Sequence, residues 1–428
     1  MARVAVIGAG PAGLVSARWL RAAGLDVAVL ERTGEVGGIW RPDTGIAYPS
    51  LLTNTSKQRT AFSDLGFDAS LPDFPGRAAV HAYLERYADA TGVRALIRRQ
   101  NVRTVRPDTD GWIVDGERFD AVVIATGLFG RALEPPLAGR DRFTGEVIHS
   151  SAYRDPGRFA GRDVVVAGAG SSGADIAIEL ATVARSVTVA VRELPLFSPR
   201  VHRGRPYDHR ATRLAQLLPA RVRGWRAQRV IAAEYSRRGL RLERMRATRT
   251  PGLGLLDLIA SGQVSVRAAL VGLEERGALF ADGTRVHADA AILATGYLPD
   301  FPFLPAGLPD RIGGRLALHR LVFPPGVPGI AFVGMMRVSG PVLPLAELQA
   351  RWVAAVLTGR ASLPSEVAMR AEIRERFARA RAAENDQLRV EFLPYANDIA
   401  GLIGAKPSLW RHPRLLTSPV RARDYRLP

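Results

Sequence analysis

Residues 4 to 13 read Val-Ala-Val-Ile-Gly-Ala-Gly-Pro-Ala-Gly, and this stretch decides the fold class. Val4 to Ile7 is an apolar run of strand length, and the helical pattern Leu14 to Ala23 follows the last glycine. In such a context the first glycine permits a tight turn, the second lets a pyrophosphate approach the backbone, and the third allows close helix–strand packing. The pyrophosphate then binds at the helix N-terminus. The stretch therefore predicts a strand, turn and helix that bind a dinucleotide.

The same pattern occurs a second time in the chain. Residues 164 to 167 (Val-Val-Val-Ala) lead into residues 168 to 173 (Gly-Ala-Gly-Ser-Ser-Gly), and the helical pattern Ala174 to Ala184 follows. A second strand is expected after each helix, at Val27 to Glu31 and at Val187 to Arg192. The repeat predicts an α/β fold with two dinucleotide-binding domains that are Rossmann-like and three-layered.

Another pair of similar segments occurs later in each copy. Residues 121 to 127 read Ala-Val-Val-Ile-Ala-Thr-Gly and residues 290 to 296 read Ala-Ala-Ile-Leu-Ala-Thr-Gly, each after a predicted hairpin. A single strand of this kind cannot close a domain alone, so the chain is expected to return to the first unit after Gly296. We therefore predict a domain of residues 158–291 inserted in a domain of residues 1–157 and 292–428. The last part is expected to contain helices, such as Met369 to Ala383.

The ends of the second strands distinguish two nucleotides. Glu31 ends its strand, and a carboxylate at this place accepts hydrogen bonds from an adenosine ribose and repels a 2′-phosphate. The first site therefore suits FAD. The corresponding strand of the second copy ends at Arg192, whose guanidinium can pair with a 2′-phosphate. The second site therefore suits NADPH rather than NADH.

Composition narrows the chemistry and the cellular location. The chain contains no cysteine, which excludes disulfides, thiolate metal ligands and the redox dithiol that some related flavoproteins use. No metal site is predicted. Electrons from the nicotinamide must pass to dioxygen, to a partner protein or to a small acceptor. Neither a signal-peptide pattern nor an apolar run of the roughly 20 residues that span a bilayer occurs, so we expect a cytoplasmic protein without a transmembrane segment.

Several motifs resemble those of the flavin-containing monooxygenase family. Residues 143–153 match its Phe-x-Gly-x-x-x-His-x-x-x-Tyr fingerprint, which ends here at Tyr153. Further similar segments, in the same order, are Gly37 to Trp40, Leu52 to Lys57, Ala294 to Tyr297 followed by Phe301 to Leu304, Glu347 to Trp352, and Ile403 to Pro407. The resemblance extends along nearly the whole chain.

The resemblance implies a monooxygenase that uses FAD, NADPH and dioxygen. NADPH reduces the flavin, and dioxygen then adds to give a 4a-hydroperoxyflavin that oxygenates a nucleophilic nitrogen or sulfur of a small-molecule substrate. The cofactor does the difficult chemistry, so few side chains need be catalytic. In the family a loop asparagine contacts flavin and nicotinamide and steadies the oxygenated intermediate, and Asn54 is the matching position. An amide suits this role because it donates and accepts hydrogen bonds without titrating.

The residues predicted to contact the cofactors lie in the glycine-rich turns, the strand ends and the loop around Asn54. They are Gly8, Ala9, Gly10, Pro11, Ala12, Gly13, Glu31, Gly38, Ile39, Trp40, Thr53, Asn54, Thr55, Thr126, Gly127, Gly168, Gly170, Ser171, Ser172, Gly173, Ala174, Asp175, Arg192, Thr295 and Gly296.

Some positions depart from the family pattern. Ser56 stands where members often have proline, Thr60 where they have methionine, and Leu65-Gly66 where they have Phe-Pro. These positions flank the flavin loop, and we expect them to reshape the substrate side. His149 of the fingerprint is expected to be structural rather than an acid–base group.

Two alternative functions stay open. A Baeyer–Villiger-type ketone monooxygenase shares the scaffold, although its fingerprint typically closes with Trp-Pro, whereas Arg154 follows the fingerprint tyrosine here. A flavin electron-transfer or redox-responsive partner protein would make no oxygenated product. The sequence does not indicate the oligomeric state, and a homodimer is one option.

The net charge of +18 is concentrated in one segment. Residues 192–249 contain 16 arginines against four acidic residues. Between Arg210 and Arg238 the arginines alternate with apolar residues, which predicts amphipathic helices within an insertion at about residues 197–250. Three interpretations are open: a lid over the substrate channel, a contact with a membrane surface or a carrier or other partner, and a solvated face. No nucleic-acid-binding fold is recognisable, so no nucleic acid is expected as a partner.

Overall fold

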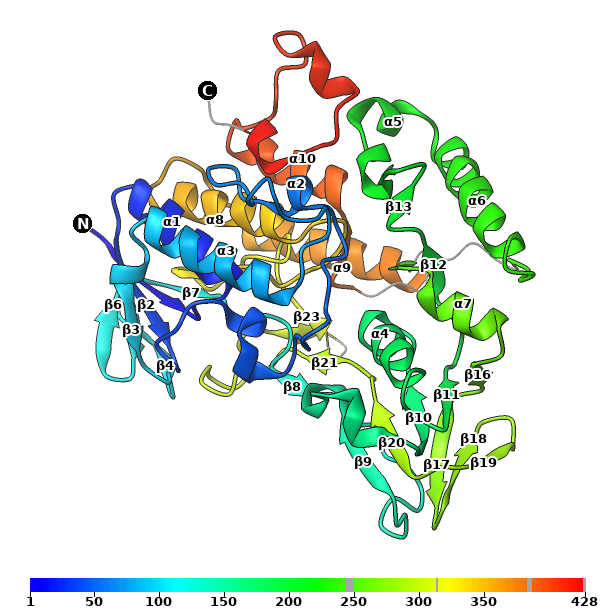
Figure 1. Ribbon diagram of the computed structural model, residues 1–428. Helices are drawn as coiled ribbons and strands as arrows, with labels where there is room; N and C mark the ends of the chain where they lie inside the picture. The colour runs from blue at the N-terminus through cyan, green and yellow to red at the C-terminus, as the bar shows by residue number, and fades with distance from the viewer. Residues whose placement is uncertain (243–248, 313–314, 383–386, 426–428) are drawn as a thin grey trace.

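Two five-stranded parallel sheets form the framework of the molecule (Figure 1). The computed structural model describes residues 1–242, 249–312, 315–382 and 387–425. The first sheet lies on the left of the view in Figure 1 and the second lies at the lower right.

The first glycine-rich stretch forms the strand, turn and helix that its pattern predicts. β1 (Arg3–Ile7) leads through the turn into α1 (Pro11–Ala22). The helix begins earlier than Leu14 because proline is accepted in the first helical turn, where its missing N–H costs no hydrogen bond. β1 pairs with β2 (Asp26–Glu31) on one side and with β7 (Ala121–Ile124) on the other. Both neighbours are parallel to β1, so its apolar side chains are buried on both faces of the sheet.

The second glycine-rich stretch forms the equivalent unit. β10 (Asp163–Ala167) leads into α4 (Ser171–Leu180), and β11 (Ser186–Ala190) and β20 (Ala290–Leu293) flank β10. The helix ends before the expected Ala184, and the Val183 carbonyl accepts a hydrogen bond from the Gly161 N–H instead (2.9 Å). β11 ends before the expected Arg192 because its neighbour β16 (Val264–Arg267) ends there as well.

The two sheets share one strand order. The first runs β24-β7-β1-β2-β3 and the second runs β9-β20-β10-β11-β16. The outer strands are β16 together with β3 (Ile97–Arg99), β24 (Ile330–Phe332) and β9 (Glu146–His149). The predicted α/β fold with parallel sheets is confirmed, and the internal repeat in the sequence corresponds to two sheets of equal topology.

Each Ala-Thr-Gly strand follows an antiparallel meander, as the predicted hairpins indicate. The meanders consist of β4 (Val105–Asp108), β5 (Gly111–Val114) and β6 (Glu117–Phe119), and of β17 (Leu270–Glu274), β18 (Gly277–Phe280) and β19 (Arg285–His287). In the second unit Val166 packs in one cluster with Leu180 of α4, whereas Val165 packs in another with Phe280 of the meander. Neighbouring residues of a strand point to opposite faces, so helix, sheet and meander form three layers.

The chain passes between the sheets twice. β24 pairs with β7, so the chain returns to the first sheet after the second unit, as expected. β9 pairs with β20 in the second sheet, although its residues precede position 157, and β20 itself spans position 291. An edge strand joins whichever open edge its connections bring it to, and a strand pattern alone does not specify which of two similar sheets this is. The division at 157 and 291 stays a prediction.

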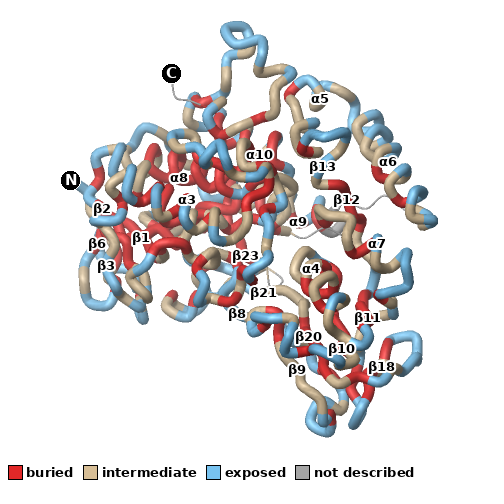
Figure 2. The backbone as a smooth tube through the Cα atoms, in the orientation of Figure 1, coloured by how far each residue is buried: buried red, intermediate tan, exposed pale blue. Residues whose placement is uncertain are grey.

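Helices from the C-terminal part complete the first unit. α8 (Leu343–Leu357) packs along α1, and α10 (Phe392–Leu402) packs on α8. α3 (Arg77–Ala90) lies beside α1, and α9 (Glu366–Ala382) covers most of the helix expected at Met369 to Ala383. Residue 383 lies outside the described residues. Figure 2 shows that buried residues concentrate in the two sheets and along α8.

The arginine-rich insertion forms helices beside the second unit. η6 (Tyr207–Arg210), α5 (Arg213–Leu217) and α6 (Ala220–Ser236) follow one another, and α6 lies at the outer edge of the molecule in Figure 1. Two short pairs, β12 (Leu196–Ser198) with β15 (Arg249–Pro251) and β13 (Val201–His202) with β14 (Arg205–Pro206), belong to it. Residues 243–248 of the expected insertion lie outside the described residues. None of the described helices combines the length and apolar character needed to cross a membrane.

The remaining short elements are α2 (Lys57–Thr60), α7 (Gly254–Ala260), β8 (Arg131–Ala132), β21 (Tyr297–Leu298), β22 (Arg311–Ile312), β23 (Arg315–Leu316), β25 (Arg337–Ser339), β26 (Arg389–Glu391), η1 (Gly38–Trp40), η2 (Pro42–Thr44), η3 (Arg94–Leu96), η4 (Ser150–Ala152), η5 (Pro156–Phe159), η7 (Pro413–Leu416) and η8 (Ala422–Asp424).

Candidate active site and dinucleotide sites

The first glycine-rich turn has the geometry of an anion-binding cradle. Gly8 has a φ of +106°, and a Cβ at this position would lie 2.8 Å from the Ala125 carbonyl oxygen. A Cβ on Gly13 would overlap the Gly8 carbonyl oxygen, so the helix approaches the strand as closely as backbone allows. Gly10 is the N-cap of α1, no side chain caps the helix, and its first turn carries no acidic residue. Pro11 has no N–H, so the N–H groups of Ala12 and Gly13 in the first turn of the helix are the donors available to a negatively charged group.

The segment similar to the family's flavin-contacting stretch lies against this turn. It forms η1 (Gly38–Trp40), which contains Ile39. The Gly37 N–H donates to the Ala9 carbonyl oxygen (3.0 Å), and a Cβ on Gly38 would lie 2.8 Å from Gly10 Cα. Two backbone segments thus meet without side chains between them, which only residues lacking a Cβ allow.

Glu31 reaches the turn from the end of β2. Its Oε2 accepts a hydrogen bond from the Ala9 N–H (2.8 Å), and its Oε1 accepts from the Thr33 hydroxyl (3.0 Å). The carboxylate is therefore held at the turn, where the ribose hydroxyls of a nucleotide would donate to it. Thr33 and Arg41 also belong to this site, although no motif predicted them. Arg41 is buried and donates to the hydroxyl of Thr33, and its position directly after Trp40 is the signal that could have found it.

The second glycine-rich turn repeats the first with a more open approach. Gly168 has a φ of +109°, and a Cβ on Gly173 would overlap the Gly168 carbonyl oxygen. Gly170 is the N-cap of α4, and a Cβ added there would meet nothing within 4 Å. Ser171 and Ser172 are the first residues of α4, followed in the helix by Ala174 and Asp175, and no side chain caps the helix. This helix start is also suited to an anion.

Asn54 connects the two predicted nucleotide sites. Its Nδ2 donates to the Ser171 hydroxyl at 3.3 Å, although the residues are 117 positions apart. The neighbouring threonines fix the loop: the Thr53 N–H donates to the Pro75 carbonyl oxygen (3.0 Å), and the Thr55 hydroxyl lies 2.8 Å from that of Thr60. Asn54 itself is exposed, so its amide can receive ligands.

The Ala-Thr-Gly segments extend from the carboxyl ends of β7 and β20. Thr126 is exposed and Gly127 has a φ of +79°. Thr295 donates to the Leu133 carbonyl oxygen, and the Gly296 carbonyl oxygen accepts from the Leu133 N–H (2.9 Å). In the second copy the segment is thus already bonded to protein.

His149 lies against the second of these segments. Its Nε2 lies 3.1 Å from the Gly296 carbonyl oxygen and its Nδ1 lies 3.0 Å from the Ser151 hydroxyl. Burial lowers the pKa of His149. The imidazole is buried, and both of its nitrogens are hydrogen-bonded to the protein. It therefore holds the segments of Ser151 and Gly296 in place, which agrees with a structural role.

Arg192 lies two residues beyond the end of β11 and is exposed. The preceding Val191 N–H donates to the Arg267 carbonyl oxygen (3.1 Å), so the residues at the ends of β11 and β16 are held side by side. Its guanidinium can turn toward the adenosine end of a nucleotide that lies along the second sheet.

The start of the arginine-rich insertion docks on the loop that carries Asn54. Asp208 Oδ2 accepts hydrogen bonds from the Ser56 N–H (2.8 Å) and hydroxyl (3.0 Å), and Arg59 Nη1 donates to the Asp208 carbonyl oxygen (3.0 Å). His209 Nε2 lies 3.1 Å from the Ser56 hydroxyl, and burial lowers the pKa of His209. Ser56 stands where the family often has proline, and both its N–H and its hydroxyl donate to Asp208. A proline has neither donor, so it could not form these bonds.

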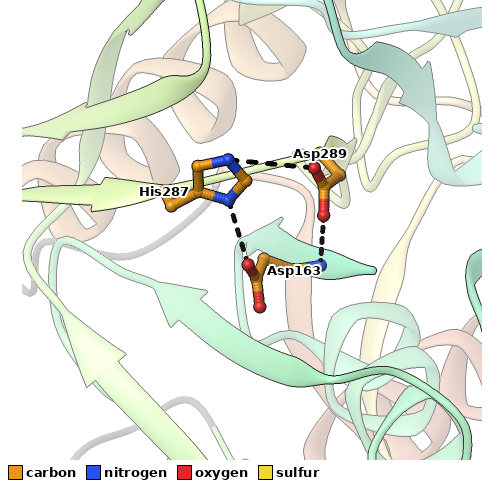
Figure 3. Close-up of side chains that lie close together, drawn as sticks. All are labelled: Asp163, His287 and Asp289. Carbon is orange, nitrogen blue, oxygen red and sulfur yellow. Dashed lines mark hydrogen bonds and ion pairs between the residues drawn. The ribbon is translucent and has the colours of Figure 1, made fainter. Parts of the chain in front are cut away.

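A separate cluster of Asp163, His287 and Asp289 lies at the opposite, amino end of β10 (Figure 3). His287 Nδ1 lies 2.9 Å from Asp163 Oδ2. Arg185 Nη2 lies 3.0 Å from Asp289 Oδ2 and also pairs with Asp163, and these bonds hold the pKa of Asp163 well below its usual range. The arginine supplies the positive charge that a metal ion would bring, and the cluster is remote from the glycine-rich turns.

Two parallel sheets of one strand order, each with an uncapped helix after a glycine-rich turn, define the class of α/β proteins built on two sheets of dinucleotide-binding type. Within this class the chain belongs to the flavin-binding monooxygenase-like family, whose model matches residues 1–424. The family resemblance of the sequence motifs is thereby confirmed, and the chain is a flavoprotein monooxygenase, an oxidoreductase.

Relatives cover nearly the whole chain. Flavin-containing monooxygenase 5 of Oryctolagus cuniculus is 32% identical over 99% of this chain and 88% of its own length. Dimethylaniline monooxygenase [N-oxide-forming] 4 of Rattus norvegicus is 30% identical over 95% of this chain and 79% of its own length.

Solved structures agree with the fold. S-allyl-L-cysteine S-oxygenase from Allium sativum has a TM-score of 0.71 and 27% identity, and the alignment covers 94% of this chain and 88% of that one. Cyclohexanone monooxygenase in its open form has a TM-score of 0.69, with 94% of this chain and 98% of that one covered. Its identity is only 20%, so this second likeness concerns the fold alone.

Proposed function

We propose that the protein is an FAD- and NADPH-dependent monooxygenase that inserts one oxygen atom of dioxygen into a nucleophilic nitrogen or sulfur of a small molecule. The hydrogen bond from Asn54 to Ser171 carries the proposal, because it joins the loop asparagine to the second glycine-rich turn. Among the similar proteins, the dimethylaniline monooxygenase is named as N-oxide-forming and the Allium sativum protein as an S-oxygenase, which supports nitrogen or sulfur as the acceptor atom.

FAD would occupy the first glycine-rich turn. A Cβ on Gly8 or Gly38 would strike backbone, so only glycine lets the turn and the segment after β2 pack closely enough to form this site. The uncapped N-terminus of α1 would receive the pyrophosphate, and Glu31 would accept hydrogen bonds from the ribose. The exposed Thr126 and the half-buried Gly127, just after the end of β7, would border the flavin.

NADPH would occupy the second turn. The space around Gly170 and the uncapped start of α4 fit a second pyrophosphate, which Ser171 and Ser172 would border. Arg192 would pair with the 2′-phosphate and so select NADPH over NADH. Bound FAD and NADPH would supply the oxygen and hydride chemistry of the reaction.

The protein contributes placement and exclusion of water. Asn54 would present an amide that donates and accepts between the two cofactors. The bonds of Asp208 to Ser56 close the side of the loop toward the insertion, which keeps water from the reacting atoms.

The test measures coupling of NADPH oxidation to product. Purified, FAD-loaded protein is given NADPH or NADH, a tertiary amine, a thioether or a cyclic ketone, and air. NADPH consumed, oxygenated product and hydrogen peroxide are quantified together. We expect preference for NADPH and near-stoichiometric N-oxide or sulfoxide.

Each other outcome has a defined meaning. Ester or lactone formed from the ketone as fast as N-oxide or sulfoxide would indicate the Baeyer–Villiger type of reaction. NADPH consumption that yields peroxide with every substrate and no oxygenated product would overturn the proposal, because the electrons would then reach dioxygen without transfer of an oxygen atom to a substrate.

We propose further that the arginine-rich insertion is a lid over the substrate side. Its inner edge bonds to the flavin loop through Asp208 and His209. Arg213 anchors α5 by an ion pair with Asp424 (3.0 Å) that is almost wholly buried. An Asp208→Ala variant should release more peroxide per NADPH, whereas unchanged coupling would contradict the lid.

The outer face of α6 carries exposed arginines, and a separate measurement tests whether it contacts a membrane surface. Arg221, Trp225, Arg226 and Arg229 are exposed there. Sedimentation with phosphatidylglycerol vesicles, lost in a variant with all three arginines changed to glutamine, would show a membrane-surface contact. Absence of binding at low salt would leave the lid as the segment's role.

A further inference from the structure

One face of α4 is built to meet the first unit. Ser171, Asp175 and Glu179 are four residues apart, so they lie one above another on the helix. Ser171 begins the helix at the second glycine-rich turn, and Glu179 lies near its last turn. We call these three residues the loop face of α4.

Every residue of the loop face is hydrogen-bonded to a side chain outside the second sheet's own strands and helices. Asn54 Nδ2 donates to Ser171 Oγ (3.3 Å), Tyr48 Oη to Asp175 Oδ2 (2.6 Å) and Tyr153 Oη to Glu179 Oε2 (2.7 Å), and Ser50 Oγ donates to Glu179 Oε1. Tyr48, Ser50 and Asn54 belong to the segment that carries the predicted catalytic loop. Tyr153 closes the fingerprint at the passage between the two units.

The hydrogen bonds of Tyr48 and Tyr153 to α4 are buried, which increases their effect on the position of the loop. Tyr48 is 1% exposed and Tyr153 is wholly buried, and burial raises the pKa of both tyrosines. Burial also raises the pKa of Asp175 and of Glu179. A buried hydroxyl without a partner is costly, and in surroundings of low polarity each satisfied bond is strong and directional.

We propose that the bonds of Tyr48, Ser50 and Tyr153 to Asp175 and Glu179 form a hydroxyl–carboxylate latch that sets the position of Asn54 over the second glycine-rich turn. The residues of the latch are positioning residues, since none of them needs to touch the reacting atoms. The latch acts through the loop: with residues 48 and 50 fixed on α4, the chain reaches the turn four residues later at Asn54. The inference rests on the proposed function, in which Asn54 works between FAD and NADPH.

The hydroxyl groups of Tyr48 and Tyr153 are not needed to fill space in the core. The rings of Tyr48 and Tyr153 lie in the apolar cluster of the second unit, and phenylalanine would fill the same volume. The hydroxyls instead pair with carboxylates that would otherwise be poorly solvated. They therefore specify which part of α4 the loop meets, and apolar contacts alone would do this less sharply.

The first test replaces Tyr48 by phenylalanine in the FAD-loaded protein and follows amide hydrogen exchange of residues 48–56 without NADPH. We expect exchange in this segment to rise about tenfold, as befits the loss of a hydrogen bond to a carboxylate. The dissociation constant of NADP⁺, from fluorescence titration, should rise by a similar factor. Peroxide released per NADPH should rise as well.

The matched control is Tyr235→Phe. Tyr235 is also buried, and its hydroxyl accepts a hydrogen bond from the Phe197 N–H (3.1 Å) within the second unit. This variant loses one buried hydrogen bond but no contact between units. Its exchange at 48–56 and its coupling should equal those of the unchanged protein.

A second pair of variants tests the acceptor. Asp175→Asn keeps an oxygen that accepts from Tyr48, so exchange at 48–56 should stay close to that of the unchanged protein. Asp175→Ala removes the acceptor and should reproduce Tyr48→Phe in the exchange measurement. Equal exchange in both variants would overturn the latch.

The outcomes separate the inference from the proposed function. If the unchanged protein forms no oxygenated product, the proposed function fails, and exchange at 48–56 still judges the latch. If the unchanged protein is coupled but Tyr48→Phe matches Tyr235→Phe in exchange and NADP⁺ affinity, the inference fails alone. Faster exchange with unaltered NADP⁺ affinity and coupling would reduce the latch to a structural contact and also overturn it.

Discussion

Asn54 illustrates how a single exposed side chain acquires a role from its neighbours. Its backbone is fixed between Thr53 and Thr55, and its amide reaches Ser171 of the other unit. Because the side chain is exposed, little of the folding energy depends on it. Its loss should therefore affect chemistry rather than stability.

We expect Asn54→Ala to lower oxygenated product per NADPH by about tenfold or more, the effect of removing one well-placed donor from a reacting centre. The unfolding midpoint in urea should not change. Product and peroxide are measured as for the unchanged protein. Gln263→Ala, which removes another exposed amide, is the control. Full coupling in Asn54→Ala would remove Asn54 from the site.

Arg192 is the residue on which nucleotide choice is predicted to depend. Arg192→Ala should raise the KM for NADPH by about tenfold to a hundredfold, as a charge-assisted hydrogen bond would require. The KM for NADH should stay unchanged because NADH has no 2′-phosphate. Arg106→Ala removes an exposed arginine of the first unit and serves as the control. An equal rise for both nucleotides would assign the preference to another group.

At the scale of elements, the two strand–turn–helix units differ in how much space their turns leave. In both, the last glycine packs against the carbonyl oxygen of the first glycine. The second unit has open space at Gly170, whereas Gly10 of the first unit faces Gly38. The last glycine of each turn thus serves packing, and in the second turn the middle glycine leaves room for the ligand.

Two alanine variants should separate these tasks in the second unit. Gly173→Ala should lower the free energy of unfolding by about 3 kcal/mol, because its Cβ would overlap backbone that cannot move aside. Gly170→Ala should change it by no more than about 1 kcal/mol. The same Gly170→Ala variant should weaken NADP⁺ binding about tenfold, or ~1.4 kcal/mol, since its methyl group projects where the pyrophosphate would lie. Urea unfolding and nucleotide titration measure the two effects, and tight NADP⁺ binding by Gly170→Ala would place the nucleotide elsewhere.

At the scale of the whole molecule, α8 connects distant parts of the first unit through a buried carboxyl. Glu347 is 1% exposed, and its carboxylate oxygens accept from the Ser63 N–H (2.8 Å) and hydroxyl. Burial raises the pKa of Glu347 to about 7, and the hydrogen bonds from Ser63 and the charge of Arg351 only partly oppose this. The folded protein therefore holds a proton that the unfolded chain releases at lower pH.

This difference sets a pH dependence of stability. Between pH 4.5, the ordinary pKa of a glutamate, and about pH 7, the unfolded chain ionises while folded Glu347 stays protonated, so stability falls as pH rises. Relative to Glu347→Gln, which keeps an acceptor for Ser63, the unchanged protein should lose about 3 kcal/mol between pH 5 and pH 8. Urea unfolding of both proteins at four pH values across this range measures it. Parallel stability curves would show that Glu347 is ionised in the fold.

The sequence by itself determined the features that depend on a few neighbouring residues. Glycine spacing specified both turns and their helices, because a left-handed φ and a helix packed on its own strand are local requirements. Glu31 could be placed at the first turn because it ends the next strand of the same unit. The ordered motifs also identified the family. Helix and strand ends were less certain, as at Ala184 and Arg192, because contacts with other segments end them: a hydrogen bond from Gly161 beyond α4, and the end of β16 beside β11.

Only the tertiary structure decided how the two units meet. The Asn54–Ser171 contact, the membership of β9 in the second sheet and the docking of Asp208 on Ser56 join residues or strands that lie more than 100 positions apart. Such contacts depend on which apolar surfaces are buried together, and no local pattern encodes that choice. The two glycine-rich turns could therefore be predicted from the sequence. The placement of the Asn54 loop of the first unit beside the turn of the second unit required the folded chain.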